Sequence, residues 1–149
     1  MRQTQKGYFV PKNPEKLLSN KRIIYRSSWE LKFMIMCDTH PNIIQWASEH
    51  PDTKIPYFNP LQNKYTIYVP DFFVVYKDNS GKKRVELVEV KPAAETYVSE
   101  AKSPRHKAAL TVNIHKWKAA SEWCARKGIK FRVITEFDIF RNPGKKRKK

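Results

Sequence analysis

The sequence predicts a single α/β domain in which a mixed β-sheet is flanked by helices. A helix with a clear start signal precedes a series of short apolar strands that prolines separate. A strand, a long amphipathic helix and a final strand follow, which is the order of a right-handed parallel crossover. At 149 residues the chain is long enough to bury one hydrophobic core.

Composition divides the chain into three parts. Residues 1–20 are polar and contain Pro11 and Pro14, so we expect an extended basic arm rather than a helix. Residues 21–140 contain the predicted helices and central strands and form the folded domain. Residues 141–149 include the run GKKRKK and are expected to be a disordered basic tail.

The first helix is predicted to begin directly after Ser27. Ser27 can serve as the N-cap, and Glu30 follows at the spacing of a capping box, with apolar residues at helical intervals as far as Cys37. The pair His40-Pro41 should end the helix, because the residue before proline disfavours the helical conformation. In the capping reading, the Glu30 carboxylate would accept the backbone N–H of Ser27.

The strands are predicted between residues 42 and 91 and again near residue 131. The first four strand segments read IIQWA, IPYF, KYTIYV and DFFVVY. After a turn at residues 78–81 comes RVELVEVK, which is apolar enough on both faces to be a central strand. Residues 101–105 are a polar break before a helix over residues 106–127, and KFRVIT is the last strand. The apolar stripe of that helix is Leu110, Ile114, Trp117, Ala120 and Cys124.

Two acids and a lysine interrupt the apolar strands. Glu89 and Lys91 share one face of their strand, about 7 Å apart. The position of Asp71 on the neighbouring strand depends on the turn. A three-residue loop over 79–81, with its glycine left-handed, places Asp71 opposite Glu89 on the same face. A two-residue loop would pair Asp71 with Val88 and put the acids on opposite faces.

An opposed pair of carboxylates predicts a bound cation. Like charges directly opposite destabilise a sheet, and the chain has only 14 acids against 30 Lys and Arg residues. Carboxylate oxygens are the ligands that Mg²⁺ prefers, and Mn²⁺ is an expected substitute. Such a metal can polarise a phosphate and activate a water, while Lys91 holds that water or stabilises the developing charge. The alternative is that Asp71 and Glu89 are strand-edge acids paired with Lys91 and Arg84.

The positive charge indicates a polyanionic partner. The formal net charge is +16, and +11 remains without the last five residues, all of which are basic. Nucleic acid is the expected partner, because its phosphates release counterions when Lys and Arg approach. An anionic membrane is the alternative partner. The sequence has no run of 18 apolar residues, however, so we expect a soluble protein that does not bind a membrane.

Some basic and polar residues are candidates for contact with DNA. Lys107, Asn113 and Lys116 on the long helix are expected to face phosphate, with a solvated helix face as the alternative. Lys145, Lys146 and Arg147 in the tail are expected to contact phosphate without reading sequence.

A short motif links these residues to a known superfamily. Pro70-Asp71 followed by Glu89-Val90-Lys91 resembles the PD-(D/E)xK motif of the restriction-endonuclease-like nucleases. The resemblance implies a restriction-endonuclease-like core. It also implies that the two acids and the carbonyl of Val90 bind the metal.

Longer segments extend this resemblance over most of residues 22–140. They resemble the head completion nucleases of tailed phages, a family similar to the TnsA-type transposon endonucleases. The first-helix glutamate that completes the metal site in TnsA-like enzymes matches Glu30 here. Those enzymes often carry glutamine where this chain has Glu89, so the retained acid favours an active metal site. The matching segments are YRSSWELKFM, IIQWASE, YVPDFFV, VEVKP, HKWKAASEWC and FRVITE.

The resemblance implies a Mg²⁺-dependent deoxyribonuclease that acts in phage head completion before head–tail joining. Residues 21–140 would then be the nuclease domain, with DNA and phage head or portal components as partners. Its place would be the host cytoplasm during assembly, with the virion as a second location. One alternative is a non-catalytic virion protein that binds packaged DNA ends. Another is a basic nucleic-acid-binding module unrelated to phage assembly.

Overall fold

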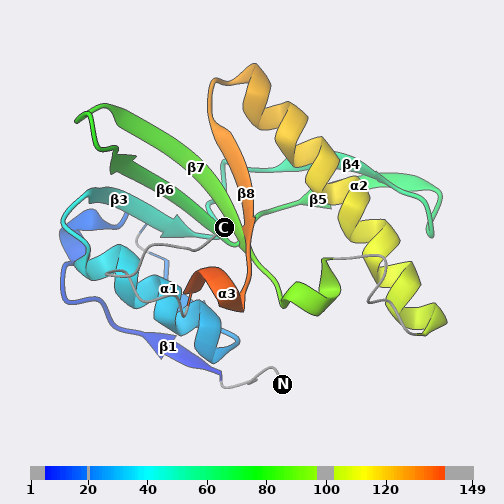
Figure 1. Ribbon diagram of the computed structural model, residues 1–149, viewed down its shortest axis with the longest axis horizontal. Helices are drawn as coiled ribbons and strands as arrows, with labels where there is room; N and C mark the ends of the chain where they lie inside the picture. Colours follow the sequence, from blue (N-terminus) through cyan, green and yellow to red (C-terminus); the bar gives the residue numbers. More distant parts are fainter. Residues whose placement is uncertain (1–5, 20, 97–102, 140–149) are drawn as a thin grey trace.

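The computed structural model describes residues 6–19, 21–96 and 103–139. Figure 1 shows a curved central sheet with α1 on one side and α2 on the other. Its elements are β1 (Gly7–Phe9), η1 (Pro14–Lys16), β2 (Ile23–Tyr25), α1 (Ser28–Thr39), β3 (Ile43–Ser48), β4 (Ile55–Asn59), β5 (Lys64–Tyr68), β6 (Phe72–Lys77), β7 (Lys83–Val90), η2 (Ala93–Glu95), α2 (Pro104–Arg126), β8 (Lys130–Ile134) and α3 (Glu136–Ile139).

The central sheet has four strands in the order β3-β6-β7-β8. The pairs β3–β6 and β6–β7 are antiparallel, and β7–β8 is parallel, with α2 in the connection between them. The predicted mixed sheet flanked by helices is therefore confirmed. Two small antiparallel pairs, β1–β2 and β4–β5, lie outside this sheet.

Each face of the sheet has its own apolar core. Val88 and Val90 of β7 belong to the core on the α1 side, whereas Leu87 belongs to the core on the α2 side. Because side chains alternate along a strand, Glu89 points to the same side as Leu87. The α1-side core is built from Ile23, Trp29, Phe33, Met34, Cys37, Ile43, Trp46, Phe72, Val74, Val88, Val90 and Ile134. The α2-side core is built from Ile55, Tyr57, Tyr68, Leu87, Ala120 and Cys124.

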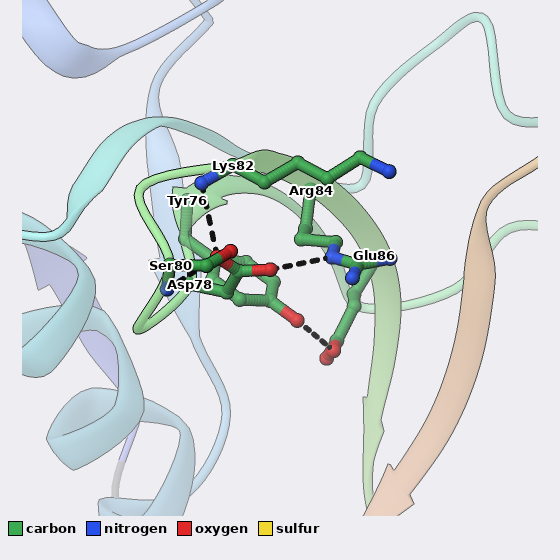
Figure 2. A network of polar contacts seen from close by, with 6 residues as sticks. All are labelled: Tyr76, Asp78, Ser80, Lys82, Arg84 and Glu86. Atoms are coloured by element: carbon green, nitrogen blue, oxygen red, sulfur yellow. Dashed lines mark hydrogen bonds and ion pairs between the residues drawn. The ribbon is translucent and has the colours of Figure 1, made fainter.

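The turn between β6 and β7 has the predicted three-residue loop. The backbone N–H of Asp78 donates to the carbonyl of Lys82 over 2.9 Å, and Gly81 adopts a φ of 81°. Figure 2 shows how the Asp78 carboxylate holds this turn. It accepts the backbone N–H groups of Ser80 and Lys82, each over 2.9 Å, and Nε of Arg84 over 2.8 Å. The turn thereby fixes the register of the two strands that follow from it.

The N-terminus of α1 is capped as predicted, with one correction. Oγ of Ser27 accepts the backbone N–H of Glu30 over 3.1 Å. The Glu30 carboxylate does not accept the N–H of Ser27, because it accepts that of Arg26 over 3.0 Å. At the other end, His40 is the C-cap, in an extended conformation that suits the residue before Pro41.

The long helix α2 begins two residues before its predicted start. Oγ of Ser103 accepts the backbone N–H of His106, and Pro104 follows at the first helical position, where a missing N–H costs nothing. Leu110 is buried, but Ile114 is 43% exposed, so its placement in the apolar stripe was wrong. The expected end at the glycine is confirmed, since Gly128 has a φ of 72°.

Residues 6–19, within the predicted arm, pack onto the domain. The strand β1 pairs with β2, and Leu17 forms a bridge to Trp46. The Asp38 carboxylate at the end of α1 accepts the backbone N–H groups of Lys12 and Asn13 over 2.8 and 2.9 Å. The predicted tail, 141–149, lies outside the described residues. Within the described ranges, none of the helices combines the length and apolar character that a bilayer-spanning segment needs.

Candidate active site

Asp71 and Glu89 meet at the end of the β6–β7 hairpin farthest from its turn. The register pairs Phe72 with Val88, and its continuation by one residue places Asp71 opposite Glu89. One oxygen of Asp71, Oδ2, accepts the backbone N–H of Val90 over 2.9 Å. The predicted facing arrangement of the two acids is thus supported by the register and by this hydrogen bond.

Both carboxylate oxygens of Glu89 contact polar groups. The hydroxyl of Tyr68 donates to Oε1 over 2.8 Å, and Nζ of Lys91 lies 3.9 Å from Oε2. Glu89 is 8% exposed, so these contacts lie in a largely buried setting. A buried carboxylate with a cation and a hydroxyl beside it keeps a defined orientation, because alternative rotamers would leave its oxygens without partners.

The two carboxyl groups have perturbed acidities. Burial raises the pKa of Asp71 well above its usual range, and the charges of Glu89 and Glu30 raise it further. The Val90 N–H and Lys91 oppose this rise. Burial also raises the pKa of Glu89, against the opposing effects of Lys91 and the Tyr68 hydroxyl. Without a further cation, the site therefore has more negative charge than its surroundings stabilise.

Lys116 reaches this site from α2. Its Nζ lies 5.5 Å from the ring centroid of Tyr68 and 5.8 Å from that of Tyr57. Burial lowers the pKa of Lys116, the charge of Glu89 opposes that shift, and Lys91 adds to it. Lys116 therefore lies in the field of the candidate catalytic groups, and its contact with phosphate stays a prediction.

Tyr68 is a site residue that sequence reasoning missed. It ends β5, and only two residues separate it from Asp71, so its closeness to the first acid could be read from the chain. Its hydrogen bond to Glu89 could not, because β5 belongs to a different sheet from β7.

Glu30 lies near the acids but does not join them in one cluster. Its charge raises the pKa of Asp71, while its own carboxylate is bound to the Arg26 backbone. Among residues 6–19, 21–96 and 103–139, no group of three or more His, Cys, Asp or Glu side chains is arranged to hold a metal ion. The role of Glu30 as a metal ligand stays a prediction.

The remaining predicted residues are dispersed. Lys107 is exposed, and Asn113 borders a cavity of about 210 Å³ together with Glu95 and His106. Lys145, Lys146 and Arg147 lie outside the described residues. Of the alternative pairing of the site acids with Lys91 and Arg84, the Lys91–Glu89 ion pair is present, but the Arg84 part is wrong, since Arg84 binds Asp78 at the far end of the hairpin. A groove of about 670 Å³ on the α1 side is lined by Phe33, Tyr76, Glu86 and Arg132, among others, but by none of the candidate catalytic residues.

The donor set suits a hard divalent cation. Asp71 and Glu89 offer carboxylate oxygens, the ligand type that Mg²⁺ and Mn²⁺ favour. Burial raises the pKa of Asp71 most, and the charge of Glu89 raises it further, so a cation between the two acids would favour their charged forms. Lys91 and Lys116 lower the pKa of Glu89, but it remains above its usual value, so a bound cation would stabilise the charged form further.

Comparison with known proteins defines the class. Residues 40–136 match the model of the TnsA-like endonuclease N-terminal family, and the chain belongs to this family. The matched range includes Asp71, Glu89, Lys91 and Lys116, whereas Glu30 precedes it. The chain is also similar to the head completion nuclease of Enterobacteria phage T4. The two are 38% identical over 141 residues, which cover 87% of this chain and 90% of the relative.

These comparisons confirm the recognised family and the predicted fold class, a restriction-endonuclease-like α/β core. They also confirm the class of activity, that of an endonuclease, with DNA as the substrate that this class implies.

Proposed function

We propose that this chain is a metal-dependent DNA nuclease that hydrolyses phosphodiester bonds in phage head completion, before head–tail joining. The relative from phage T4 is named a head completion nuclease, and its similarity to this chain extends over nearly all of both sequences. The observation on which the proposal rests is the position of Asp71, partly buried, opposite the buried Glu89, with Lys91 beside Glu89.

The metal ligands of this proposal are Asp71, Glu89 and the carbonyl of Val90, with Glu30 as a third acid from the start of α1. Mg²⁺, or Mn²⁺ in its place, would polarise the phosphate, make a bound water acidic and neutralise the leaving oxygen. Asp71 already has one oxygen committed to the Val90 N–H, which leaves Oδ1 for a ligand. The Tyr68 and Lys91 contacts hold Glu89 in place.

Lys91 is the residue that we assign to the chemical step. Its ammonium lies beside Glu89, where it can orient the attacking water or stabilise the negative charge that develops on the phosphate. In that step the water oxygen bonds to phosphorus and gives up a proton to solvent, one backbone P–O bond breaks, and the leaving oxygen takes up a proton. An ammonium that already lies 3.9 Å from a site carboxylate needs little displacement to reach the phosphate.

The partners follow from the same proposal. DNA is the substrate, and Lys107, Asn113 and Lys116 on α2 contact its phosphates, together with Lys145, Lys146 and Arg147 of the tail. Head or portal components of the phage are the protein partners, and the protein acts in the host cytoplasm during assembly or within the virion. The net charge of +16 supports contact with DNA, and DNA is present both in the host cytoplasm and in the virion.

The test is a cleavage assay on supercoiled and linear DNA with Mg²⁺, with Mn²⁺ and with chelator. We expect the wild type to cut only with metal and Glu89→Gln to be inactive. Glu86→Gln is a matched control, because Glu86 lies on the same strand and binds Tyr76 and Arg132 instead of the site. Equal cleavage by wild type and Glu89→Gln would contradict the proposal. Tight binding of DNA ends without cleavage would favour the non-catalytic head completion protein.

A further inference from the structure

Tyr68 connects two parts of the site that come from different elements. Its hydroxyl donates to Oε1 of Glu89 on β7 over 2.8 Å, and the face of its ring lies 5.5 Å from Nζ of Lys116 on α2. The side chain is 5% exposed and packs in the α2-side core with Tyr57 and Leu87. One rigid, buried residue thus contacts both an expected metal ligand and an expected phosphate contact.

The hydroxyl contact bears on the carboxylate. A donor on Oε1 favours the charged form of Glu89 and restricts its rotamer, so Oε2 stays on the side of Lys91. Residues that hydrogen-bond metal ligands in this way orient them, and their loss typically lowers metal affinity 10- to 100-fold. The bond would therefore affect metal affinity more than it affects the fold.

The ring contact bears on the lysine. Lys116 is partly buried, and its ammonium lies over the rings of Tyr57 and Tyr68, a geometry that stabilises a cation through the aromatic quadrupole. A flexible lysine held in this way needs less ordering when it meets a phosphate. Loss of the Tyr68 ring would therefore weaken DNA binding at the site, and loss of the hydroxyl alone would not.

We propose that Tyr68 is a positioning residue of the nuclease site, which orients Glu89 through its hydroxyl and Lys116 through its ring. The inference rests on the proposed function, and it assigns to β5 a part in the site beyond the acids and Lys91. In this role Tyr68 acts through Glu89 and Lys116 and not on the phosphate or the water directly. The hydroxyl contact predicts an effect on metal affinity, and the ring contact predicts a separate effect on DNA binding.

The variants that separate the contacts are Tyr68→Phe, which loses only the hydroxyl, and Tyr68→Leu, which loses both contacts. Tyr76→Phe is a matched control. Tyr76 of β6 donates to Oε2 of Glu86 over 2.6 Å, a bond of the same type to a glutamate of the same strand as Glu89, but outside the site (Figure 2). It controls for the general loss of a tyrosine–glutamate hydrogen bond.

The first measurement is Mn²⁺ and Mg²⁺ binding by calorimetry to the DNA-free protein, with thermal melts in chelator as a check of folding. We expect Tyr68→Phe to bind metal about 10-fold more weakly than wild type and Tyr76→Phe to match wild type. The second measurement determines kcat and KM separately on a short DNA duplex. Tyr68→Phe should lower kcat at limiting metal with KM for DNA unchanged, and Tyr68→Leu should raise that KM as Lys116→Gln does.

Two outcomes would overturn the inference while leaving the proposed function intact. One is wild-type metal affinity in Tyr68→Phe, and the other is an equal loss of affinity in Tyr68→Phe and Tyr76→Phe. Absence of metal binding and metal-dependent cleavage in the wild type would instead overturn the proposed function, and this inference with it. If Tyr68→Leu does not fold, the comparison of Tyr68→Phe with Tyr76→Phe still decides the role of the hydroxyl.

Discussion

Asp71 lies opposite Glu89 across β6 and β7, and its Oδ2 accepts the backbone N–H of the next residue on β7, Val90. Two acids placed in this way are costly in a sheet, because like charges directly opposite repel each other and both groups are removed from water. The cost is offset if the two carboxylates bind a cation.

Replacement of Lys91 by alanine should abolish cleavage and leave DNA affinity nearly unchanged. The ammonium acts at the reacting phosphate in the proposed mechanism, but it is one positive group among 30 Lys and Arg residues. Cleavage rates and equilibrium binding of the same oligonucleotide, compared with wild type, measure the two effects separately. Normal turnover by Lys91→Ala would show that this residue has no chemical role.

In chelator, the contribution of Asp71 and Glu89 to the free energy of unfolding should fall as pH rises above the ordinary range of carboxyl groups. The pKa values of Asp71 and Glu89 are raised in the folded state, chiefly by burial, so the folded protein binds protons more tightly than the unfolded chain. Stability is then lost between the unfolded pKa of about 4 and the raised folded values. Glu89→Gln removes one such group, so its stability relative to wild type should improve with pH. Urea melts from acid to neutral pH test this, and a constant difference between the proteins would contradict it.

Gly81→Ala should destabilise the protein by about 1 kcal/mol. The φ of Gly81 is 81°, a conformation that alanine adopts only at a cost. Asn79→Ala is the control in the same loop, since Asn79 has an exposed side chain. Urea denaturation of both variants measures the difference. Equal stabilities would mean that the left-handed residue does not govern the turn.

Deletion of Lys145–Lys149 should weaken DNA binding and reduce its dependence on salt, with metal-dependent cleavage retained. Each lost phosphate contact lowers the slope of log K against log salt by about 0.9. Binding measured over a range of salt concentrations gives the slope for the full chain and for the truncated chain. An unchanged slope would mean that the tail does not contact DNA.

Local sequence signals were enough to predict the β6–β7 hairpin and the position of Asp71 opposite Glu89. The turn at residues 78–81 requires a glycine with positive φ, and its loop length determines whether Asp71 and Glu89 share a face. The cap at Ser27 was likewise predictable, because it depends on residues within one helical turn.

Contacts between distant elements could not be predicted in this way. Tyr68 and Lys116 meet because β5 and α2 pack against the same side of the sheet, and no local pattern encodes that packing. Glu30 shows the same limit, since its spacing fits a capping box but its carboxylate accepts the N–H of Arg26. Ile114 fits a helical stripe, yet it is exposed because no element covers that part of α2 among the described residues.

Thermal melting of wild type and Asp71→Asn, each in chelator and in Mg²⁺, tests whether the facing acids form a metal site. Asp71→Asn keeps the side-chain shape and removes one of the two opposed charges. In chelator it should melt at the wild-type temperature or above, because the repulsion from Glu89 is relieved. In Mg²⁺ the wild type should gain stability by mass action, and the variant should gain much less.

The opposite pattern would contradict the account. If Asp71→Asn melts well below wild type in chelator and both proteins respond equally to Mg²⁺, Asp71 is a structural partner of the Val90 N–H and of nearby lysines. The facing acids would then not be a metal site.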